Sequence, residues 1–423
     1  MKSVDEEGRQ QIKQLNTLGE TVQVFDASNN KTVYEYDFLS NLKKVTNANS
    51  QMTDYEYDRL KRVKTIENQN IGLTAFTYDD NSNVQTKLDS NNNLITYEYD
   101  AMNRVARIDY SDESYVEYIY DEPRDYGVGR LTTINTNMNE LTTTKTLHYD
   151  EKGLLIKTRT IIDGEVYVVE YNYDKAGNLI YEKTPDNTEI EYVYNNMNQL
   201  QSIKVNGGEK ISYDYDAPQN PLLVQNIDYP NSQTDFTYTD RDRIESLHIA
   251  GADGEFKRFY GFDDVGNLID EYSDLSASPS TQIGHYDYDD TYRLTGVTDF
   301  NDYYGGDMSY DYDAVGNIRQ NNDIVYDYEE GNDRLSSDGT FDYEYDARGN
   351  LKTKTLTGTN IKTRYFYDYE NRLSTVILPD GSAINYYYDA DGSRVKKTDW
   401  EGTTIYIYDA KGNVVYEKFL PAE

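Results

Sequence analysis

The sequence predicts an all-β protein: one long antiparallel meander of two-stranded repeats, curled into a spiral, hollow or partly hollow β-shell. A Tyr-Asp pair or a close variant recurs 18 times between Tyr36 and Tyr408, at a mean step of about 22 residues. Short segments that alternate apolar and polar residues separate gaps rich in Asn, Asp, Gly and Ser, which is typical of strands and turns. A fixed period in this range indicates an array of one small structural unit.

We call the Tyr-Asp pair of each repeat its anchor. The first five anchors, from Tyr36 to Tyr120, follow one another at steps of 21 residues. Because stacked repeats form one body, we predict a single continuous array over residues 1–423, of about 18 repeats of ~21 residues, with the first and last repeats incomplete. The residues predicted as structural anchors, with the turn glycines that follow some of them, are Tyr36, Asp37, Tyr57, Asp58, Tyr78, Asp79, Tyr99, Asp100, Tyr173, Asp174, Gly177, Tyr312, Asp313, Gly316, Tyr345, Asp346, Gly349, Tyr408, Asp409 and Gly412.

Each repeat is predicted to hold two strands and two turns, as residues 52–78 illustrate. Tyr55 and Tyr57 alternate with acidic residues, a short polar link follows, and alternation resumes at 63–66 and 73–78. The third residue after the anchor Asp is often Gly or Asn, which tolerate the positive φ that such a hairpin loop needs. The anchor Asp is expected to accept hydrogen bonds from turn N–H groups. The second turn is looser in sequence, with 185–187 and 379–381 as its clearest examples.

The number of strands predicts a rolled sheet. About 36 strands are expected, whereas open sheets rarely exceed about 10 strands without curling or splitting. No segment has a helical pattern that could cover one face. The sheet is therefore expected to enclose a space wider than side chains can fill.

Composition excludes several classes of function. There are 41 Lys and Arg against 76 Asp and Glu, a net charge of −35, so the surface repels nucleic acid and anionic lipid. No run approaches ~18 apolar residues, so we predict no membrane insertion. The absence of Cys excludes disulfides, thiolate metal sites and thiol catalysis. The first 25 residues have no apolar segment of the kind found in signal peptides.

No residue pattern predicts catalysis, and we expect no enzyme, cofactor or metal site. His148, His248 and His285 lie in different repeats, outside any metal-binding motif. The pairs Asp214/Asp216 and Asp311/Asp313 place two carboxylates on one strand face, but they arise from the repeat itself. Turn capping and solubility explain them best, with weak Ca²⁺ binding left open.

Tyr pairs two residues apart are the more open case, because there are 45 Tyr against 11 Phe and one Trp. Pairs such as Tyr97/Tyr99 place two rings on one strand face, where cross-strand aromatic pairing is the structural interpretation. The functional alternative is a platform that stacks sugar rings or holds an unfolded cargo. Long steps mark insertions at 122–127 and 273–281, on rims that could contact partners.

The repeat pattern Tyr-x-Tyr-Asp-x-x-Gly-[Asn/Arg]-Leu resembles the YD repeats of the RHS family, with 171–179 and 343–351 as clear matches. That family includes bacterial polymorphic toxins, shell components of insecticidal toxin complexes, wall-associated proteins and teneurins. The resemblance implies a β-sheet spiral that forms a cocoon, which in the toxins encloses a C-terminal effector. The Asp-Pro-x-Gly-Leu motif of the cargo-bearing members does not occur in this sequence.

These observations predict a non-catalytic RHS/YD-repeat β-shell scaffold, a segment of a larger bacterial toxin or surface protein that encloses or presents a C-terminal effector. Its expected partners are other segments of that parent protein or the enclosed effector, and its expected location is secreted or at the cell surface. The alternative is an extracellular carbohydrate- or cell-binding module that uses a Tyr-rich, acidic surface, with carbohydrate as its partner.

Overall fold

The computed structural model describes residues 1–138, 141–215, 220–252, 254–274, 281–300 and 305–422. The chain divides into two compact units, each assembled from two stretches of sequence. Unit 1 comprises Met1–Met52 and Glu191–Asp327, and unit 2 comprises Thr53–Ile190 and Tyr328–Glu423. The two units are described separately. That residues 1–423 form a single continuous array stays a prediction.

Unit 1 is built from two runs of consecutive strands. The strands are β1 (Lys2–Val4), β2 (Gln10–Leu15), β3 (Thr21–Phe25), β4 (Lys31–Tyr36), β5 (Leu42–Thr46), β19 (Leu200–Val205), β20 (Gly208–Asp214), β21 (Asn226–Tyr229), β22 (Ser232–Tyr238), β23 (Ile244–Gly251), β24 (Gly254–Phe262), β25 (Leu268–Asp274), β26 (Thr281–Tyr288), β27 (Leu294–Asp299), β28 (Met308–Tyr312), β29 (Ile318–Asn321) and β30 (Ile324–Val325).

Unit 2 is built in the same way, and the residues of β6, β18 and β31 are divided between the two units. The strands are β6 (Met52–Tyr57), β7 (Val63–Asn68), β8 (Gly72–Tyr78), β9 (Val84–Leu88), β10 (Leu94–Tyr99), β11 (Val105–Tyr110), β12 (Tyr115–Tyr120), β13 (Leu131–Met138), β14 (Leu141–Tyr149), β15 (Leu155–Ile162), β16 (Glu165–Tyr173), β17 (Leu179–Lys183), β18 (Glu189–Tyr194), β31 (Asp327–Tyr328), β32 (Leu335–Ser337), β33 (Phe341–Tyr345), β34 (Leu351–Leu356), β35 (Lys362–Tyr367), β36 (Leu373–Ile377), β37 (Ala383–Tyr388), β38 (Arg394–Thr398), β39 (Gly402–Tyr408) and β40 (Val414–Pro421).

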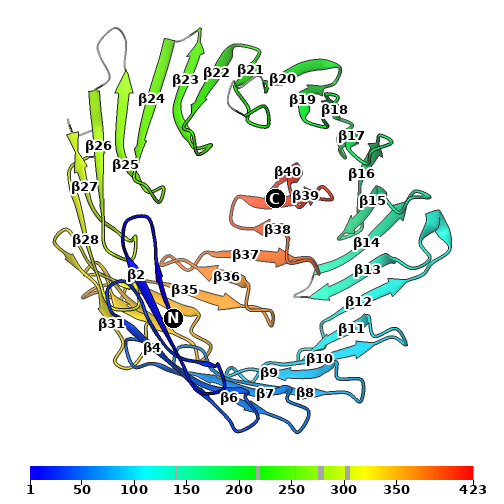
Figure 1. Cartoon of the computed structure of the whole chain (residues 1–423). Helices are drawn as coiled ribbons and strands as arrows, with labels where there is room; N and C mark the ends of the chain where they lie inside the picture. The colour runs from blue at the N-terminus through cyan, green and yellow to red at the C-terminus, as the bar shows by residue number, and fades with distance from the viewer. Residues whose placement is uncertain (139–140, 216–219, 253, 275–280, 301–304, 423) are drawn as a thin grey trace. The chain divides into compact units, whose positions relative to one another are not determined.

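Within each run, a strand pairs antiparallel with the strand that follows it (Figure 1), as β10–β11, β11–β12 and β12–β13 do. The register shifts at the anchor: Glu98 faces Arg107, but Tyr99 faces Val105. This bulge, in which one strand carries an extra residue, turns the chain into the first turn of the repeat. The all-β antiparallel meander predicted from the sequence is confirmed.

Helical structure is minimal in the described part of the chain. The 3₁₀ turn η1 (Arg124–Tyr126) lies inside the insertion predicted at 122–127, and Phe300 also has 3₁₀ geometry. Here the first turn runs from Asp121 to Arg130, whose backbone groups close it with a hydrogen bond of 3.0 Å. Most of the second predicted insertion, residues 275–280, lies outside the described residues. No helix among the described residues is long and apolar enough to cross a bilayer.

One cluster of the apolar core of unit 2 lies near the second turns of β10–β13. Ile95, Val116 and Ile134 are each at most 3% exposed and form one cluster. Tyr369 and Ala390, from turns more than 200 residues later in the chain, pack against this cluster. The face that carries these apolar side chains is therefore covered by the later strands of the same unit.

Candidate functional site

The first turn of the repeat, the turn that follows the anchor, is closed by the anchor Asp. In the turn after β10, the Asp100 N–H donates to the Arg104 carbonyl at 2.9 Å, and the Asn103 N–H donates to the Asp100 carbonyl at 3.0 Å. The Asp100 Oδ1 accepts from the backbone N–H groups of Met102 and Arg104 at 2.8 and 3.0 Å. The Arg104 Nε donates to the other carboxylate oxygen at 2.6 Å. One carboxylate thus satisfies the turn backbone and fixes a neighbouring side chain.

This geometry recurs at every predicted anchor Asp. In each case Oδ1 accepts at least two backbone N–H bonds and Oδ2 accepts from the Asn or Arg four residues on. The anchor aspartates bonded in this way are Asp37, Asp58, Asp79, Asp100, Asp174, Asp313, Asp346 and Asp409.

The third residue after the anchor Asp has positive φ, as its Gly or Asn identity predicts. Gly177, Gly316, Gly349 and Gly412 have φ between 80° and 101°, and Asn103 has φ 62°. Non-glycine residues adopt the same conformation where the turn sequence differs, as Lys61 and Tyr292 do. The expected φ at this position is therefore confirmed.

Turn hydrogen bonds also set the acidity of these aspartates. The backbone N–H of Arg104 is the largest influence on Asp100, and it lowers the pKa of that carboxyl below its ordinary value. The side-chain amide of Asn178 does the same for Asp174. Because a bonded carboxylate is favoured over the neutral acid, these side chains stay charged and closed on their turns at neutral pH.

The anchor Tyr links each repeat to the one before it. The Tyr99 hydroxyl donates to the carbonyl of Val84 at 2.8 Å, and Val84 is the first residue of the preceding strand, β9. The predicted anchors that donate such a bond to a backbone carbonyl are Tyr36, Tyr78, Tyr99, Tyr173, Tyr312 and Tyr408. Tyr57 and Tyr345 are the remaining two predicted anchor tyrosines. Tyr57 is the last residue of β6, and the centre of the Tyr345 ring lies 5.7 Å from the Arg334 guanidinium. That these anchors hold the array together stays a prediction.

Arginine at the fourth position after the anchor adds a second link, directed to the following repeat. The Arg104 guanidinium, already bonded to Asp100, lies 4.1 Å from the centre of the Tyr120 ring and 2.5 Å from the Asp121 carboxylate. Arg372 likewise lies over the ring of Tyr388 at 4.8 Å. Cation–π contact and ion pairing together connect one first turn to the next.

The second turn is more regular than its sequence suggests. In the turn between β9 and β10, the Asp89 N–H donates to the Asn93 carbonyl at 3.2 Å, and the Asn92 N–H donates to the Asp89 carbonyl at 3.0 Å. Turns 26–30, 47–51, 184–188 and 378–382 have the same pair of bonds. The second turn is looser in sequence than the first, since Asp, Asn, Thr and Leu all begin the same five-residue loop, but its backbone hydrogen bonds are regular.

In unit 2, second turns of the earlier strands contact first turns of the later strands, and we call this contact the seam. Asp89 pairs with Arg348 at 2.8 Å, and their side chains are only 3% and 15% exposed. The Asn91 amide donates to Asp346 at 2.8 Å, and the Tyr110 hydroxyl donates to Glu370 at 2.9 Å. The seam joins residues that lie about 250 positions apart in the sequence.

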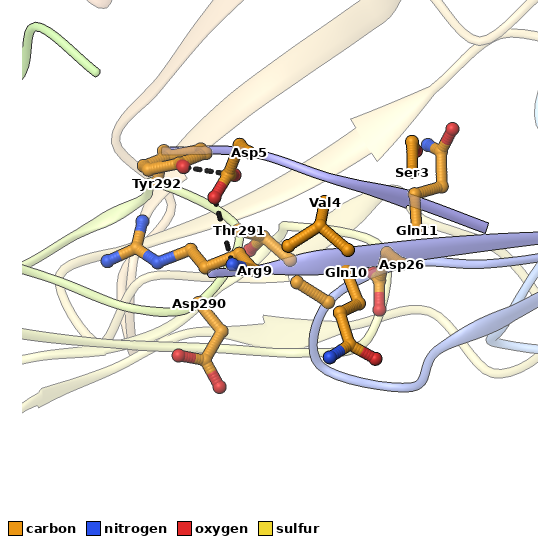
Figure 2. Close-up of a pocket in the computed structure, with 11 residues that line it drawn as sticks. Ser3, Val4, Asp5, Arg9, Gln10, Gln11, Asp26, Asp290, Thr291 and Tyr292 are labelled. Carbon is orange, nitrogen blue, oxygen red and sulfur yellow. Dashed lines mark hydrogen bonds between the residues drawn. The ribbon is translucent and has the colours of Figure 1, made fainter. Parts of the chain in front are cut away.

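Unit 1 has an equivalent contact between the turn 5–9 and the first turn that follows β26 (Figure 2). The Tyr292 hydroxyl donates to the Asp5 carboxylate, which also accepts the Arg9 N–H at 2.9 Å, and the Arg9 guanidinium lies 4.0 Å from the Tyr292 ring centre. A pocket of about 410 Å³ opens beside these residues. The turn 5–9 does follow a strand, β1, which has three residues.

The residues weighed for catalysis or metal binding are dispersed. His148 contacts Asp125, and His285 contacts Asp270, whose carboxylate raises the pKa of His285. Among the residues that the structure describes, no three His, Asp or Glu side chains are placed to hold a metal ion.

The pair Asp311/Asp313 does not lie on one strand. β28 ends at Tyr312, so Asp313 lies in the turn while Asp311 lies in the strand. β20 ends at Asp214, and Asp216 lies outside the described residues. At Asp311/Asp313 the repeat places the second Asp beyond the strand, so these two carboxylates do not lie side by side on one strand face.

Comparison with solved structures shows the fold. The chain is similar to the Photorhabdus luminescens Tc holotoxin pore, with TM-score 0.78 and 15% identity, over 96% of this chain and 24% of that one. It is equally similar to the TcdB2-TccC3-Cdc42 structure, with TM-score 0.78 and 14% identity, over 94% of this chain and 24% of that one.

Curated relatives match about half of the chain. The double-stranded DNA deaminase toxin A of Burkholderia cenocepacia is 27% identical over 267 residues, 55% of this chain and 18% of that toxin. The tRNA nuclease WapA of Bacillus subtilis is 25% identical over 249 residues, 53% of this chain and 10% of the nuclease. The chain therefore spans less than a fifth of the length of either relative.

Family models agree with the repeat grammar. The RHS repeat model matches residues 345–383 and 367–404, which confirms the resemblance drawn from the Tyr-Asp pattern. The teneurin YD-shell model matches residues 2–243. Since this match extends over more than half of the chain, the protein belongs to the teneurin YD-shell family.

Proposed function

We propose that the chain is a non-catalytic wall segment of a β-shell, part of a larger secreted or surface-exposed bacterial protein that encloses or presents an effector. Its immediate partners are other segments of that parent protein or the effector. In this proposal the repeats form one continuous array over residues 1–423.

The observation that carries the proposal is the repeated linkage of turns and strands. Each predicted anchor Asp closes its own turn, and six of the eight predicted anchor tyrosines donate a hydrogen bond to the preceding strand, so these contacts join neighbouring repeats. Similarity to toxin structures of the same fold supports the shell role. An arrangement used in many equal copies suits a wall better than a single reaction site.

The seam supplies a test of enclosure. In the full parent protein, proteinase treatment of the native shell should leave the segment after the repeats intact. Arg348→Glu places a second carboxylate against the buried Asp89 and should open the seam, so the downstream segment should become cleavable. The matched control is Lys411→Glu, which makes the same charge change at the equivalent turn position, where the side chain is exposed. Equal cleavage of the downstream segment in native protein and both variants would contradict enclosure.

The carbohydrate-binding alternative stays a prediction, and no particular contact favours it. A glycan array probed with the folded chain tests it directly. Reproducible binding that disappears on substitution of exposed Tyr would favour the alternative over a pure scaffold.

A further inference from the structure

A cavity in unit 2 lies between early strands and later turns, and its lining combines aromatic and acidic side chains. Its volume is about 420 Å³, within the range of small-ligand sites. One wall is the face of β10–β13 that carries Tyr97 and Tyr118, and the other is formed by the later turns that hold Glu370, Asp389 and Asp391. Aromatic rings and carboxylates therefore face the same space.

The charges around this cavity do not balance. Arg372 is also in the wall, but its Nε is bonded at 2.7 Å to Asp368, whose side chain is 1% exposed. Lys145 forms ion pairs with two carboxylates, with its Nζ 2.7 Å from Asp391 and 4.0 Å from Asp389. Glu370 accepts a hydrogen bond from a neutral phenol, Tyr110. The three carboxylates of Glu370, Asp389 and Asp391 thus carry more negative charge than Lys145 alone can neutralise.

Asp389 differs from the predicted anchor aspartates in its hydrogen bonds, for a reason visible in the sequence. It is an anchor Asp, and its Oδ1 accepts the usual turn N–H bonds from Asp391 and Ser393 at 3.0 and 2.9 Å. The fourth position after it is Ser393 instead of Asn or Arg, so the side chain that bonds Oδ2 in other repeats is missing. Burial raises the pKa of the Asp389 carboxyl, whereas the turn hydrogen bonds lower the pKa of Asp100 and Asp174.

The two tyrosines complete the site. Neither the Tyr97 nor the Tyr118 hydroxyl has a hydrogen-bond partner among the described residues, and burial raises the pKa of each to about 12. Both phenols are therefore neutral at physiological pH and offer hydroxyl oxygens and ring faces. Ring faces attract organic cations, and Val116 and Met138 add apolar wall for an alkyl stem.

We propose that this cavity binds an alkylammonium group, the end of a lysine side chain, between the tyrosines and the Glu370 and Asp389 carboxylates. A bare metal ion fits less well, because no three carboxylates in the described part of the chain are placed as metal ligands. The mixture of aromatic, apolar and acidic walls instead suits a cation carried on a hydrocarbon stem. This inference does not depend on the enclosure proposed above.

Isothermal titration calorimetry of the intact chain with Nα-acetyl-lysine methylamide tests the proposal. We expect saturable binding, and none to the uncharged, equally long Nα-acetyl-norleucine methylamide. Glu370→Gln and Tyr118→Leu should each weaken binding about tenfold or more, because a hydrogen-bonded charge or a cation–π face is lost. Glu151→Gln, a charge loss in an exposed turn, and Tyr213→Leu, a tyrosine at the equivalent repeat position in unit 1, should leave binding unchanged.

Circular dichroism of each variant should show the native β spectrum, which separates loss of the site from loss of the fold. Binding of n-butylammonium with similar affinity would support recognition of the ammonium group itself, whereas binding of the lysine derivative alone would assign the site to polypeptides. Equal heats from the lysine and norleucine derivatives, the absence of binding by both amines, or unaltered affinity in folded Glu370→Gln would each overturn the proposal.

Discussion

The seam pair of Asp89 and Arg348 makes the most demanding prediction, because it joins two distant parts of unit 2 with little access to water. The Asp89 side chain is 3% exposed, the Arg348 side chain is 15% exposed, and their charged atoms are 2.8 Å apart. Asp89 also accepts the N–H groups of Asn91 and Asn93 at 2.8 and 3.0 Å, as part of its own turn. The informative set is Asp89→Asn, Arg348→Met and the double variant.

The two single changes should differ in cost. Asp89→Asn keeps an oxygen for the turn bonds but leaves a mostly buried guanidinium unpaired, and we expect a loss of about 3 kcal/mol. Arg348→Met leaves a carboxylate that the turn N–H groups still stabilise, so we expect a smaller loss of about 1–3 kcal/mol. The double variant removes both charges and should lose less than the sum, with a coupling of about 1–3 kcal/mol.

Urea unfolding followed by tyrosine fluorescence gives the stabilities, and hydrogen exchange with mass spectrometry locates the change. Faster exchange is expected in peptides that cover 84–99 and 346–350, on the two sides of the seam. Single losses that add within about 0.5 kcal/mol in the double variant would refute the reasoning. So would altered exchange on only one side of the seam.

Three further outcomes follow from the repeat geometry. Tyr99→Phe should lower the free energy of unfolding in urea by about 1 kcal/mol, because it removes one phenol-to-carbonyl hydrogen bond and no packing. An unchanged free energy of unfolding would mean that a hydrogen bond from the hydroxyl to water is equally favourable. Gly349→Ala should cost about 2–4 kcal/mol of unfolding free energy, since φ is +80° and the new methyl would lie 2.5 Å from the Asn70 carbonyl oxygen. The control Gly412→Ala, with φ +87° and no atom within 4 Å of the new methyl, should cost about 1–2 kcal/mol. Equal losses in the two variants would contradict the contact with Asn70. Turn aspartates such as Asp100 have a folded pKa below the ordinary 3.8, so their stabilisation is complete above about pH 4 and is lost as the pH falls through the folded pKa; an unfolding free energy that stays constant from pH 5 to pH 2 would contradict it.

The sequence predicted what is local and periodic. The strands, the first turn and its positive φ follow from Tyr, Asp and Gly recurring at fixed offsets, because the turn bonds of Asp100 reach no further than Arg104. The regular backbone geometry of the second turn could not be seen in the sequence, since residues as different as Asp89 and Leu378 begin the same loop. Backbone geometry, more than side-chain identity, defines that turn.

What the sequence could not provide is the pairing of distant repeats. Nothing in the repeat indicates that Tyr110 meets Glu370 or that Asp89 meets Arg348, because each lies in a repeat much like its neighbours. The available signal was an exception to the usual pattern: Ser393, like Leu154 and Gln199 in their repeats, stands where most repeats have Asn or Arg. That exception becomes meaningful only when the cavity beside Asp389 is known.

The tyrosine link has a consequence for how such an array can vary in length. Its donor and acceptor are 15 residues apart for Tyr99, 18 for Tyr173 and 20 for Tyr288, yet in each of these three the acceptor is the first residue of the preceding strand. The bond therefore keeps the two strand ends beside the first turn level, and the extra residues of the longer hairpins lie towards the second turn. Hairpins can lengthen in this direction without changing the alignment at the tyrosine, whereas the insertion at 122–127 lengthens a first turn instead.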